Sequence, residues 1–260
     1  MKYYIIICMF IFLFLNACSL DFDTKHKDIK SPSNKKSKPS TEEGPGREEL
    51  KPDTEEGLNK EIKNKLLNGL KNLIETANTH KEKYIKRMEE EPSDQYGMPF
   101  NGLNWGPGTE DISSNTVRSI NYRRYTYTLL SDIDTKELKE FANILTLATA
   151  YSMYNLFSSL GVDLDIVTNR LYPKKDTLDK LDTSDLQKLK NSLEKILSII
   201  KNISEMSKQL LLDYQNDTNL IKTDVNKLKS HVSALYNQFK EKAEESDKLQ
   251  KTVISLIKTL

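Results

Sequence analysis

The chain has 260 residues, of which 37% are hydrophobic and 30% charged, and 39 Lys and Arg residues against 38 Asp and Glu residues give a formal net charge of +1. A chain of this kind is charge-rich but nearly neutral, and it lacks the general field that attracts nucleic acid or acidic ligands. Only 9 glycines and 8 prolines occur, while Lys, Glu, Leu, Asn and Ile abound, so the composition favours helices over sheets.

The N-terminus has the pattern of a secretory signal peptide. Lys2 precedes an apolar run of about 13 residues, shorter than the roughly 20 that a membrane-spanning helix needs. The run ends in Leu-Asn-Ala-Cys, and the spacing Leu-x-Ala-Cys resembles a bacterial lipobox. We therefore expect a lipoprotein signal peptide over residues 1–17, cleavage between Ala17 and Cys18, and lipid on the Cys18 thiol. The alternative is a chance Cys behind an ordinary signal peptide.

Processing of this kind removes both cysteines from further chemistry. Cys8 leaves with the signal peptide and Cys18 carries lipid, so we expect no disulfide and no thiolate metal ligand in the mature protein. More than one acyl chain is needed for a stable anchor, and a triacylated Cys18 meets that need. The sequence thus predicts a protein held on a membrane face by lipid.

Residues 18–57 are predicted to form a lipidated, disordered tether. They contain few large apolar residues, a basic first half and a mainly acidic second half. Such a segment buries too little surface to offset its chain entropy. We expect it to hold the rest of the chain away from the membrane.

Residues 58–260 are predicted to form an all-α domain, a single helical bundle of about five to seven helices. Apolar residues at intervals of three and four predict a first helix over residues 58–90, which Pro92 ends. The irregular stretch 91–111 carries the only Trp, Trp105, with Tyr96 and Phe100. These rings either plug the end of the bundle or form a contact site.

Four further helices are predicted in the middle of the chain. The second covers about residues 114–131, with Val117, Ile120, Tyr127 and Leu130 toward the core and its arginines paired with carboxylates. The third covers 135–160, opened by a capping box of Asp134 and Glu137, stopped by Gly161, and apolar enough to be the central helix. A short helix covers 162–172. The fifth runs from Thr183 to about Tyr214, with Asp182 or Thr183 as its cap.

The last helix has the sharpest pattern. Its apolar residues alternate at four and three, break at Lys242 and Ser246, and then resume; the two sets are Ile221, Val225, Leu228, Val232, Leu235 and Phe239, and then Leu249, Val253, Leu256 and Leu260. The break predicts that contact with the bundle ends near Phe239. The last set is then expected to contact a second subunit or a partner, or to fold back. A chain cut after Phe239 is expected to stay folded and to lose any dimer.

No catalytic constellation stands out. His26, His80 and His231 lack a partner at metal-ligand spacing, and neither a phosphate-binding glycine loop nor a His-Glu-x-x-His motif is present. We therefore expect no catalytic residue, no metal site and no cofactor. Binding, by contact surfaces on helices and loops, is the expected activity.

Four segments resemble the Lyme-disease Borrelia outer-surface lipoproteins of paralogous family fifty-four, a family that includes a complement regulator-acquiring surface protein. The segments are residues 81–97, 118–124, 175–182 and 204–216. The resemblance implies an all-helical fold with a long C-terminal helix, display on the spirochaete outer membrane, and a lipid anchor at Cys18.

The same resemblance implies a partner. It points to a host serum protein, such as factor H or another complement component, bound for immune evasion, and to a homodimer through the last helix. Other members of the family are linked to plasminogen or to host-cell attachment, so an adhesin for cells or matrix, or a plasminogen binder, is the alternative. No contact residue is carried over from the family to this chain.

Overall fold

The structure is a computed structural model that describes residues 55–90, 100, 103–106 and 108–258. The predicted signal peptide, Ala17, Cys18, His26, Tyr96 and Leu260 lie outside the described residues, as does nearly all of the predicted tether.

The described part of the chain contains six α-helices, so the all-α prediction and the predicted number of helices are confirmed. They are α2 (Glu55–Glu90), α4 (Val117–Leu130), α5 (Thr135–Leu147), α6 (Ser152–Leu171), α7 (Thr183–Gln215) and α8 (Val225–Ile257). Three short 3-10 turns connect them: η2 (Tyr172–Lys174), η3 (Leu178–Lys180) and η4 (Thr218–Leu220). The predicted long C-terminal helix is α8, which has 33 residues.

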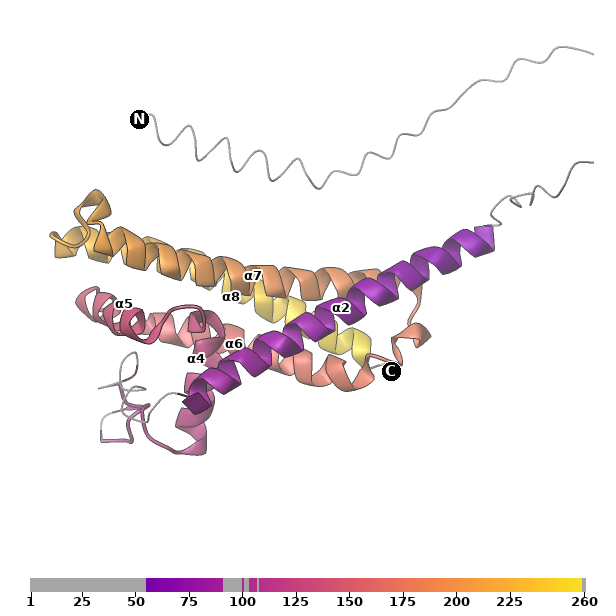
Figure 1. Ribbon diagram of the computed structural model, residues 1–260, viewed down its shortest axis with the longest axis horizontal. Helices are drawn as coiled ribbons and strands as arrows, with labels where there is room; N and C mark the ends of the chain where they lie inside the picture. The colour runs from indigo at the N-terminus through magenta and orange to yellow at the C-terminus, as the bar shows by residue number, and fades with distance from the viewer. Residues whose placement is uncertain (1–54, 91–99, 101–102, 107, 259–260) are drawn as a thin grey trace, which may run out of the picture. The chain divides into compact units, whose positions relative to one another are not determined.

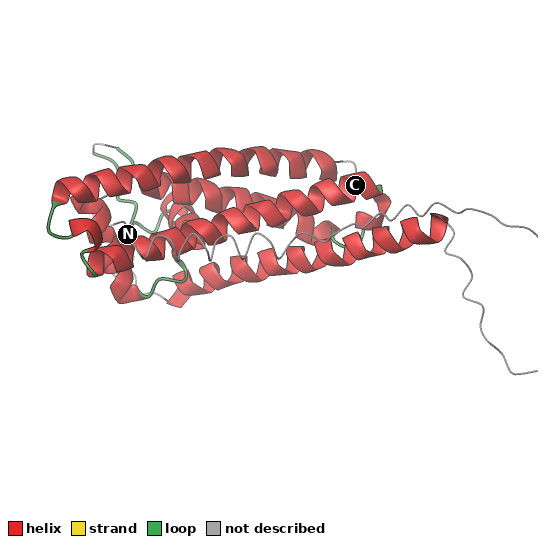
Figure 2. Cartoon of the chain, turned by 90° about the horizontal axis from the view of Figure 1, so that it is seen from above, coloured by secondary structure: helices red, strands yellow, loops and turns green. Residues whose placement is uncertain are grey.

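The helices lie side by side in an elongated bundle, and α6 is at its centre (Figures 1 and 2). α6 packs against α4, α8, α2 and α7, while α2 lies diagonally across α7. Phe157 of α6 lies in the core, with its ring centroid 6.2 Å from that of Phe141 and 5.9 Å from that of Phe239. These aromatic contacts join α5, α6 and α8 in one hydrophobic core.

Polar side chains cap several of the helices, and two of these caps, Asp134 and Asp182, are the predicted ones. The Oδ1 atom of Asp134 accepts hydrogen bonds from the Lys136 and Glu137 N–H groups, both 2.9 Å, and Glu137 accepts one from the Asp134 N–H. The predicted capping box is therefore confirmed. Asp182 caps α7 by accepting from the Asp185 N–H at 2.8 Å, and Asp224 caps α8 in the same way.

The predicted third helix is wrong in its boundaries. A break at residues 148–151 separates α5 from α6, and α6 continues through Gly161 to Leu171. Thr149 has the left-handed φ of 56° that a helix C-terminus uses, and the Ala150 N–H bonds to the Leu145 carbonyl at 2.8 Å. These are the features of a Schellman motif, in which glycine is the usual residue at the left-handed position. Here Thr149 occupies this position, so the residue types do not predict that the helix ends here.

The predicted core face of α4 is only half right. Tyr127 and Leu130 are fully buried, but Val117 is 75% exposed and Ile120 is 37% exposed. The inner face of α4 instead holds polar residues, among them Arg123, which is 1% exposed and donates from Nη1 to the Ile112 and Ser114 carbonyls at 2.5 and 2.6 Å. Main-chain carbonyls thus accept hydrogen bonds from this buried cation. Arg124 of the same helix pairs with the Asp165 carboxylate, as the sequence predicted for the arginines.

The prediction that α8 leaves the bundle near Phe239 is also wrong. Ala243, Ser246, Val253 and Ile257 are all buried within this single chain. Ser246 is small enough to sit in the core, so the polar break in the apolar pattern does not interrupt packing. A cut after Phe239 would remove core residues, and the domain is not expected to survive it.

Candidate functional site

The C-terminal half of α2 is fixed to the bundle by three residues that point to three different partners. His80 Nε2 donates to the Thr128 carbonyl of α4 at 3.0 Å, Lys81 contacts α6, and Lys83 pairs with Asp132 in the turn between α4 and α5. We call this region, where α2 meets α4, α6 and α7, the α2 corner. It contains Asp165, one of the buried charged residues of the described chain.

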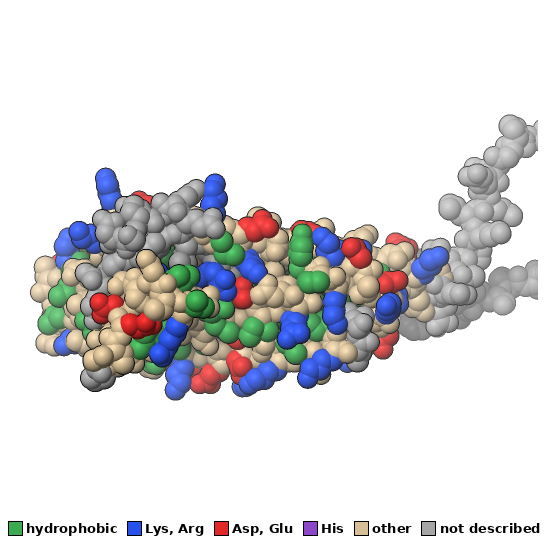
Figure 3. Space-filling model, turned by 90° about the horizontal axis from the view of Figure 1, so that it is seen from below, with side chains coloured by type: hydrophobic (Ala, Val, Ile, Leu, Met, Phe, Trp, Pro, Cys, Tyr) green, Lys and Arg blue, Asp and Glu red, His purple; other side chains and the backbone are tan. Residues whose placement is uncertain are grey.

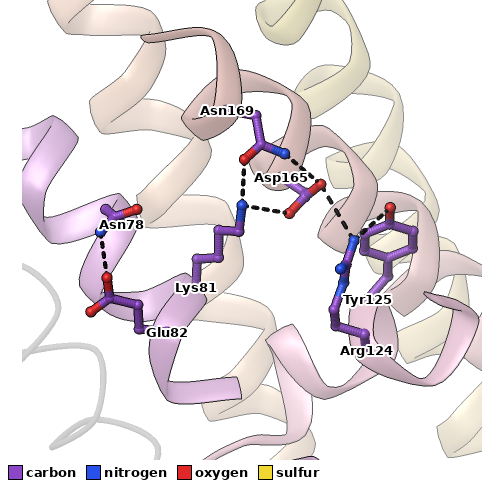
Figure 4. Close-up of polar contacts among 7 residues, drawn as sticks. All are labelled: Asn78, Lys81, Glu82, Arg124, Tyr125, Asp165 and Asn169. Atoms are coloured by element: carbon purple, nitrogen blue, oxygen red, sulfur yellow. Dashed lines mark hydrogen bonds and ion pairs between the residues drawn. The ribbon is translucent and has the colours of Figure 1, made fainter. Parts of the chain in front are cut away.

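Asp165 of α6 is the centre of the α2 corner (Figure 4). Its carboxylate lies between two cations, with Lys81 Nζ 3.4 Å from Oδ1 and Arg124 Nη2 3.6 Å from Oδ2. Asn169 donates to Oδ2 at 2.8 Å and its own amide oxygen accepts from Lys81. The Asp165 side chain is only 8% exposed, so these contacts replace its lost hydration. The cluster ties α2, α4 and α6 together.

A cavity of about 390 Å³ opens between α2 and α7, and His80 and Asp132 of the α2 corner line it. Leu197 and Ile200 form its apolar part. The other lining residues carry hydroxyl, imidazole or charged groups: Thr76, His80, Asp132, Lys201, Ser204, Glu205 and Lys208. Its size lies in the range of roughly 300–1,000 Å³ that small ligands use. It can bury one apolar group and hydrogen-bond its polar end.

The electrostatics of the cavity favour recognition over proton transfer. Burial lowers the pKa of His80, so its imidazole is neutral at neutral pH. The hydrogen bond from Lys83 is the main cause that lowers the pKa of Asp132, with the charge of Lys208 adding to it. The carboxylate therefore stays ionised beside a neutral imidazole. Both groups already serve contacts that hold α2 in place.

The irregular stretch before α4 contributes two aromatic rings of different kinds. Phe100 is fully buried, with its ring centroid 5.8 Å from Tyr127 and 5.7 Å from Tyr154, so the prediction that the rings plug the bundle is confirmed for this residue. Trp105 is only half-buried and donates from Nε1 to the Ser119 hydroxyl at 2.9 Å. The guanidinium carbon of Arg118 lies 3.7 Å from its ring centroid. For Trp105 the contact-site interpretation stays a prediction.

The residues predicted to contact a partner on α8 are not equivalent. Val253 is fully buried in the core of its own chain, whereas Leu249 and Leu256 are half-buried and pack against that core. Only Leu249 and Leu256 therefore offer part of their surface to another molecule, since Leu260 lies outside the described residues. Contact with a second subunit through this face stays a prediction.

Sequence reasoning missed the α2 corner, although one signal was present. Asp163 and Asp165 interrupt the apolar run from Leu160 to Val167, and a carboxylate in such a run is either buried with partners or at a turn. Both are buried, each 6% exposed. His80 was judged an isolated helix residue, because its partner Thr128 is 48 residues away in sequence.

The surface of the bundle is mixed in charge. On the face in Figure 3, Lys and Arg side chains alternate with Asp and Glu side chains along the bundle, with hydrophobic side chains between them. None of the described helices is both long enough and apolar enough to cross a membrane. Residues 55–90, 100, 103–106 and 108–258 contain no group of three His, Cys, Asp or Glu side chains arranged to hold a metal ion.

Comparison with known proteins places the chain in a family. Residues 86–258 match a family model described as Borrelia Bbcrasp-1 domain containing protein. A comparison with curated proteins found no match.

Solved structures agree with that family. BSE31 from the Lyme disease agent Borrelia (Borreliella) spielmanii is 50% identical with a TM-score of 0.71, over 74% of this chain and 98% of BSE31. BSA64 of B. spielmanii is 19% identical with a TM-score of 0.62, over 76% of this chain and 98% of that protein. The B. burgdorferi outer surface lipoprotein BBA64 is 21% identical with a TM-score of 0.58, over 77% of this chain and 97% of BBA64.

The similarity to BSA64 and BBA64 establishes a shared fold. The similarity to BSE31 includes the amino-acid sequence as well as the fold. Other proteins that share this fold are the Borrelia burgdorferi outer surface proteins BBA64, BBA65 and BBA66. The predicted resemblance is therefore confirmed: this chain belongs to the Borrelia family of Bbcrasp-1 domain containing proteins.

Proposed function

We propose that this protein is a lipid-anchored outer surface protein that binds a host serum protein. The observation that carries the proposal is the family match over residues 86–258, supported by outer surface relatives with the same fold. In this account the signal peptide is cut between Ala17 and Cys18, lipid on Cys18 holds the chain on the outer membrane, and the helical domain faces the host.

The partner we propose is a complement regulator, such as factor H, or another complement component. Its support is membership of the Bbcrasp-1 family. Four segments of this sequence also resemble a family that includes a complement regulator-acquiring surface protein. The protein acts by occupancy through helix faces and loops. The charged groups of the α2 corner are engaged in holding α2, which suits a rigid binding domain.

Capture from serum tests this proposal. The bait is the chain from residue 18 with Cys18→Ser, which keeps it soluble, and circular dichroism first verifies that it is helical. Mass spectrometry of the captured proteins should show enrichment of factor H or another complement protein over a bait-free control. Enrichment of plasminogen alone, or binding to host cells and matrix without serum capture, would instead support the adhesin or plasminogen-binder alternative.

A separate experiment tests the anchor. Wild-type chain expressed in a spirochaete should incorporate labelled palmitate and be removed from intact cells by added protease. The Cys18→Ser chain should incorporate none, because the thiol is the acceptor of the diacylglyceryl group. Labelling that persists in the Cys18→Ser chain would exclude Cys18 as the lipidation site.

A further inference from the structure

The turn between α7 and α8 differs from the rest of the bundle in its backbone. Asp217, Asn219 and Leu220 have left-handed φ values of 50°, 56° and 64°. Asp and Asn tolerate this region, but Leu rarely adopts it, because its Cβ crowds the neighbouring carbonyl. Such strained residues persist only where the surroundings hold them, and they are concentrated at binding sites.

The side chain of Asp217 stabilises the strained turn through three hydrogen bonds. Its Oδ1 atom accepts from the Lys222 N–H at 2.8 Å and from the Thr223 N–H at 3.1 Å, and its Oδ2 atom accepts from the Thr223 hydroxyl at 2.9 Å. The turn is therefore preformed. A surface that is ordered before binding loses less conformational entropy when a partner docks.

This preformed turn presents apolar side chains to solvent. Leu220 is 51% exposed and Val225 is 46% exposed. Beside them lies a wide hollow of about 740 Å³, lined by Asn219, Leu220, Ile221, Asn226, Lys227, Ser230 and His231. We call this hollow, together with Leu220, Val225 and the exposed Lys222, Lys227 and Lys229 of the turn and the start of α8, the α7–α8 tip; Lys227 lines the hollow, and Lys229 lies on the side of α8 that faces residues 148–152. Exposed apolar side chains at the centre of a patch with a polar rim are the anatomy of a protein-binding site.

The charge that the tip presents is positive. Lys222, Lys227 and Lys229 are exposed, and the described part of the chain provides no ion pair for them. Asp217 and Asp224 lie next to them, and their carboxylates, which accept hydrogen bonds from backbone N–H groups, offset two of these three positive charges. Lys222 is also 5.9 Å from the ring of Tyr214, so Lys227 and Lys229 are the less constrained cations. The lysines therefore form a rim that favours an acidic partner surface.

The tip also lies at the far end of the bundle from the start of α2. Lys190 of α7 lies beside Gly69 of α2, and Ser204 lies beside His80 in the cavity, so the two helices run in the same direction. The C-terminal end of α7 and the first turn of α2 are therefore at opposite ends (Figure 1).

We propose that the α7–α8 tip is the surface on which this protein binds a host serum protein, through an acidic face of that partner. Leu220 and Val225 are the apolar anchors, and Lys222, Lys227 and Lys229 steer and orient the partner. This inference rests on the proposed function and assigns it a surface. Because exposed lysines contribute mainly to association, the binding should weaken as salt concentration rises.

The test uses the serum protein that the Cys18→Ser chain captures, purified and titrated against variants. The apolar variant is Leu220→Ser with Val225→Ser, and the charge variant is Lys222→Glu, Lys227→Glu and Lys229→Glu. Matched controls are Leu58→Ser with Ile62→Ser, whose side chains are 50% and 43% exposed on α2, and Lys240→Glu, Lys248→Glu and Lys258→Glu on exposed positions of α8.

Each tip variant should lose roughly tenfold or more in affinity, while the control variants should change less than about twofold. Helical circular dichroism and an unchanged melting temperature must accompany the loss. A benzoylphenylalanine in place of Leu220 should crosslink the captured protein, and one in place of Leu58 should not.

The outcomes separate this inference from the proposed function. If tip variants bind as the wild-type chain does, the tip is not the surface, although the proposed function stands. If the wild-type chain captures no serum protein, both fall. A Leu220 crosslink to a second copy of this chain, or binding of the tip to phosphatidylglycerol vesicles in place of the protein, would overturn the assignment to an acidic protein partner.

Discussion

Gly161 of α6 packs directly against the backbone of Tyr125 of α4. A Cβ atom added to Gly161 would lie 2.1 Å from the Tyr125 carbonyl oxygen and 2.7 Å from its carbonyl carbon. Glycine in the middle of a helix costs about 1 kcal/mol relative to alanine. The absence of a side chain at Gly161 allows α4 and α6 to approach each other closely. Asp165 lies one turn further along α6.

Gly161→Ala should therefore destabilise the domain by roughly 3 kcal/mol or more, because the methyl group meets backbone that cannot move aside. Urea unfolding followed by circular dichroism measures the effect. Gly69→Ala is the matched control, since a Cβ there meets only the flexible end of Lys190, 3.0 Å away. The control should be neutral or more stable by up to about 1 kcal/mol. Equal stability of the two variants would contradict the close contact.

Asp163 of α6 gives the domain a pH dependence. Burial raises the pKa of this carboxyl to about 6, with Asp247 adding to the rise, while Ser246 and Lys251 oppose it. A raised pKa means that the folded state prefers the protonated form. Its stabilising contribution is present at about pH 4 and is lost as pH rises through about 6. The contribution amounts to roughly 2–3 kcal/mol.

Asp163→Asn should remove this dependence, because asparagine keeps the shape without the charge. The free energy of unfolding of the variant minus that of the wild-type chain should rise by about 2 kcal/mol between pH 4.5 and pH 8. Asp179→Asn at an exposed position controls for the substitution itself. A difference that does not change with pH would mean that Asp163 titrates as an exposed carboxyl does.

The Asp165 cluster should matter more than the surface ion pairs. Asp165→Ala leaves Lys81 and Arg124 facing each other in a partly buried site, and the loss should be about 3 kcal/mol. Asp176→Ala breaks the pair with Lys71, whose side chains are 77% and 42% exposed, and should cost less than about 1 kcal/mol. Thermal unfolding of both variants at one salt concentration compares them. A cost of Asp165→Ala no larger than that of the control would show that the cluster does not fix α2.

The C-terminal half of α8 should respond differently at its buried and exposed positions. Val253→Ala opens a cavity in the core and should cost about 2 kcal/mol. Leu249→Ser with Leu256→Ser touches half-buried positions and should cost less per residue, but it should convert any dimer to a monomer. Sedimentation velocity reads the mass. A dimer that survives the double variant would place the subunit contact on another face.

The long helices were predictable because their apolar residues repeat over many turns. α2 and α7 lie within a few residues of their predicted bounds, since each presents a continuous stripe to the core. The N-cap roles of Asp134 and Asp182 were also predictable, because a helix cap involves residues that are close together in sequence.

The break between α5 and α6 could not be predicted from residue types. Thr149 takes the left-handed position that glycine usually occupies, and Gly161, the expected stop, is instead required by a contact with Tyr125. The end of α8 was misjudged because a serine is small enough for the core, and Ser246 is fully buried there. In each case packing between helices overrode the local pattern.

The α2 corner and the α7–α8 tip have a similar explanation. Lys81 and Asp165 are 84 positions apart in sequence, so no local pattern joins them. The tip depends on left-handed backbone at Asp217 and Leu220, which becomes visible only when the turn is folded. Its exposed lysines looked like an ordinary solvated helix face.

The most direct test of the central claim is titration of the soluble Cys18→Ser chain with purified complement proteins by biolayer interferometry. Factor H and the terminal components are the test ligands, with plasminogen and matrix proteins measured in the same way. The account predicts saturable binding of at least one complement protein, weakened by rising salt and by the Leu220→Ser, Val225→Ser variant. Binding to plasminogen or matrix alone, with no complement protein bound by a folded chain, would contradict it.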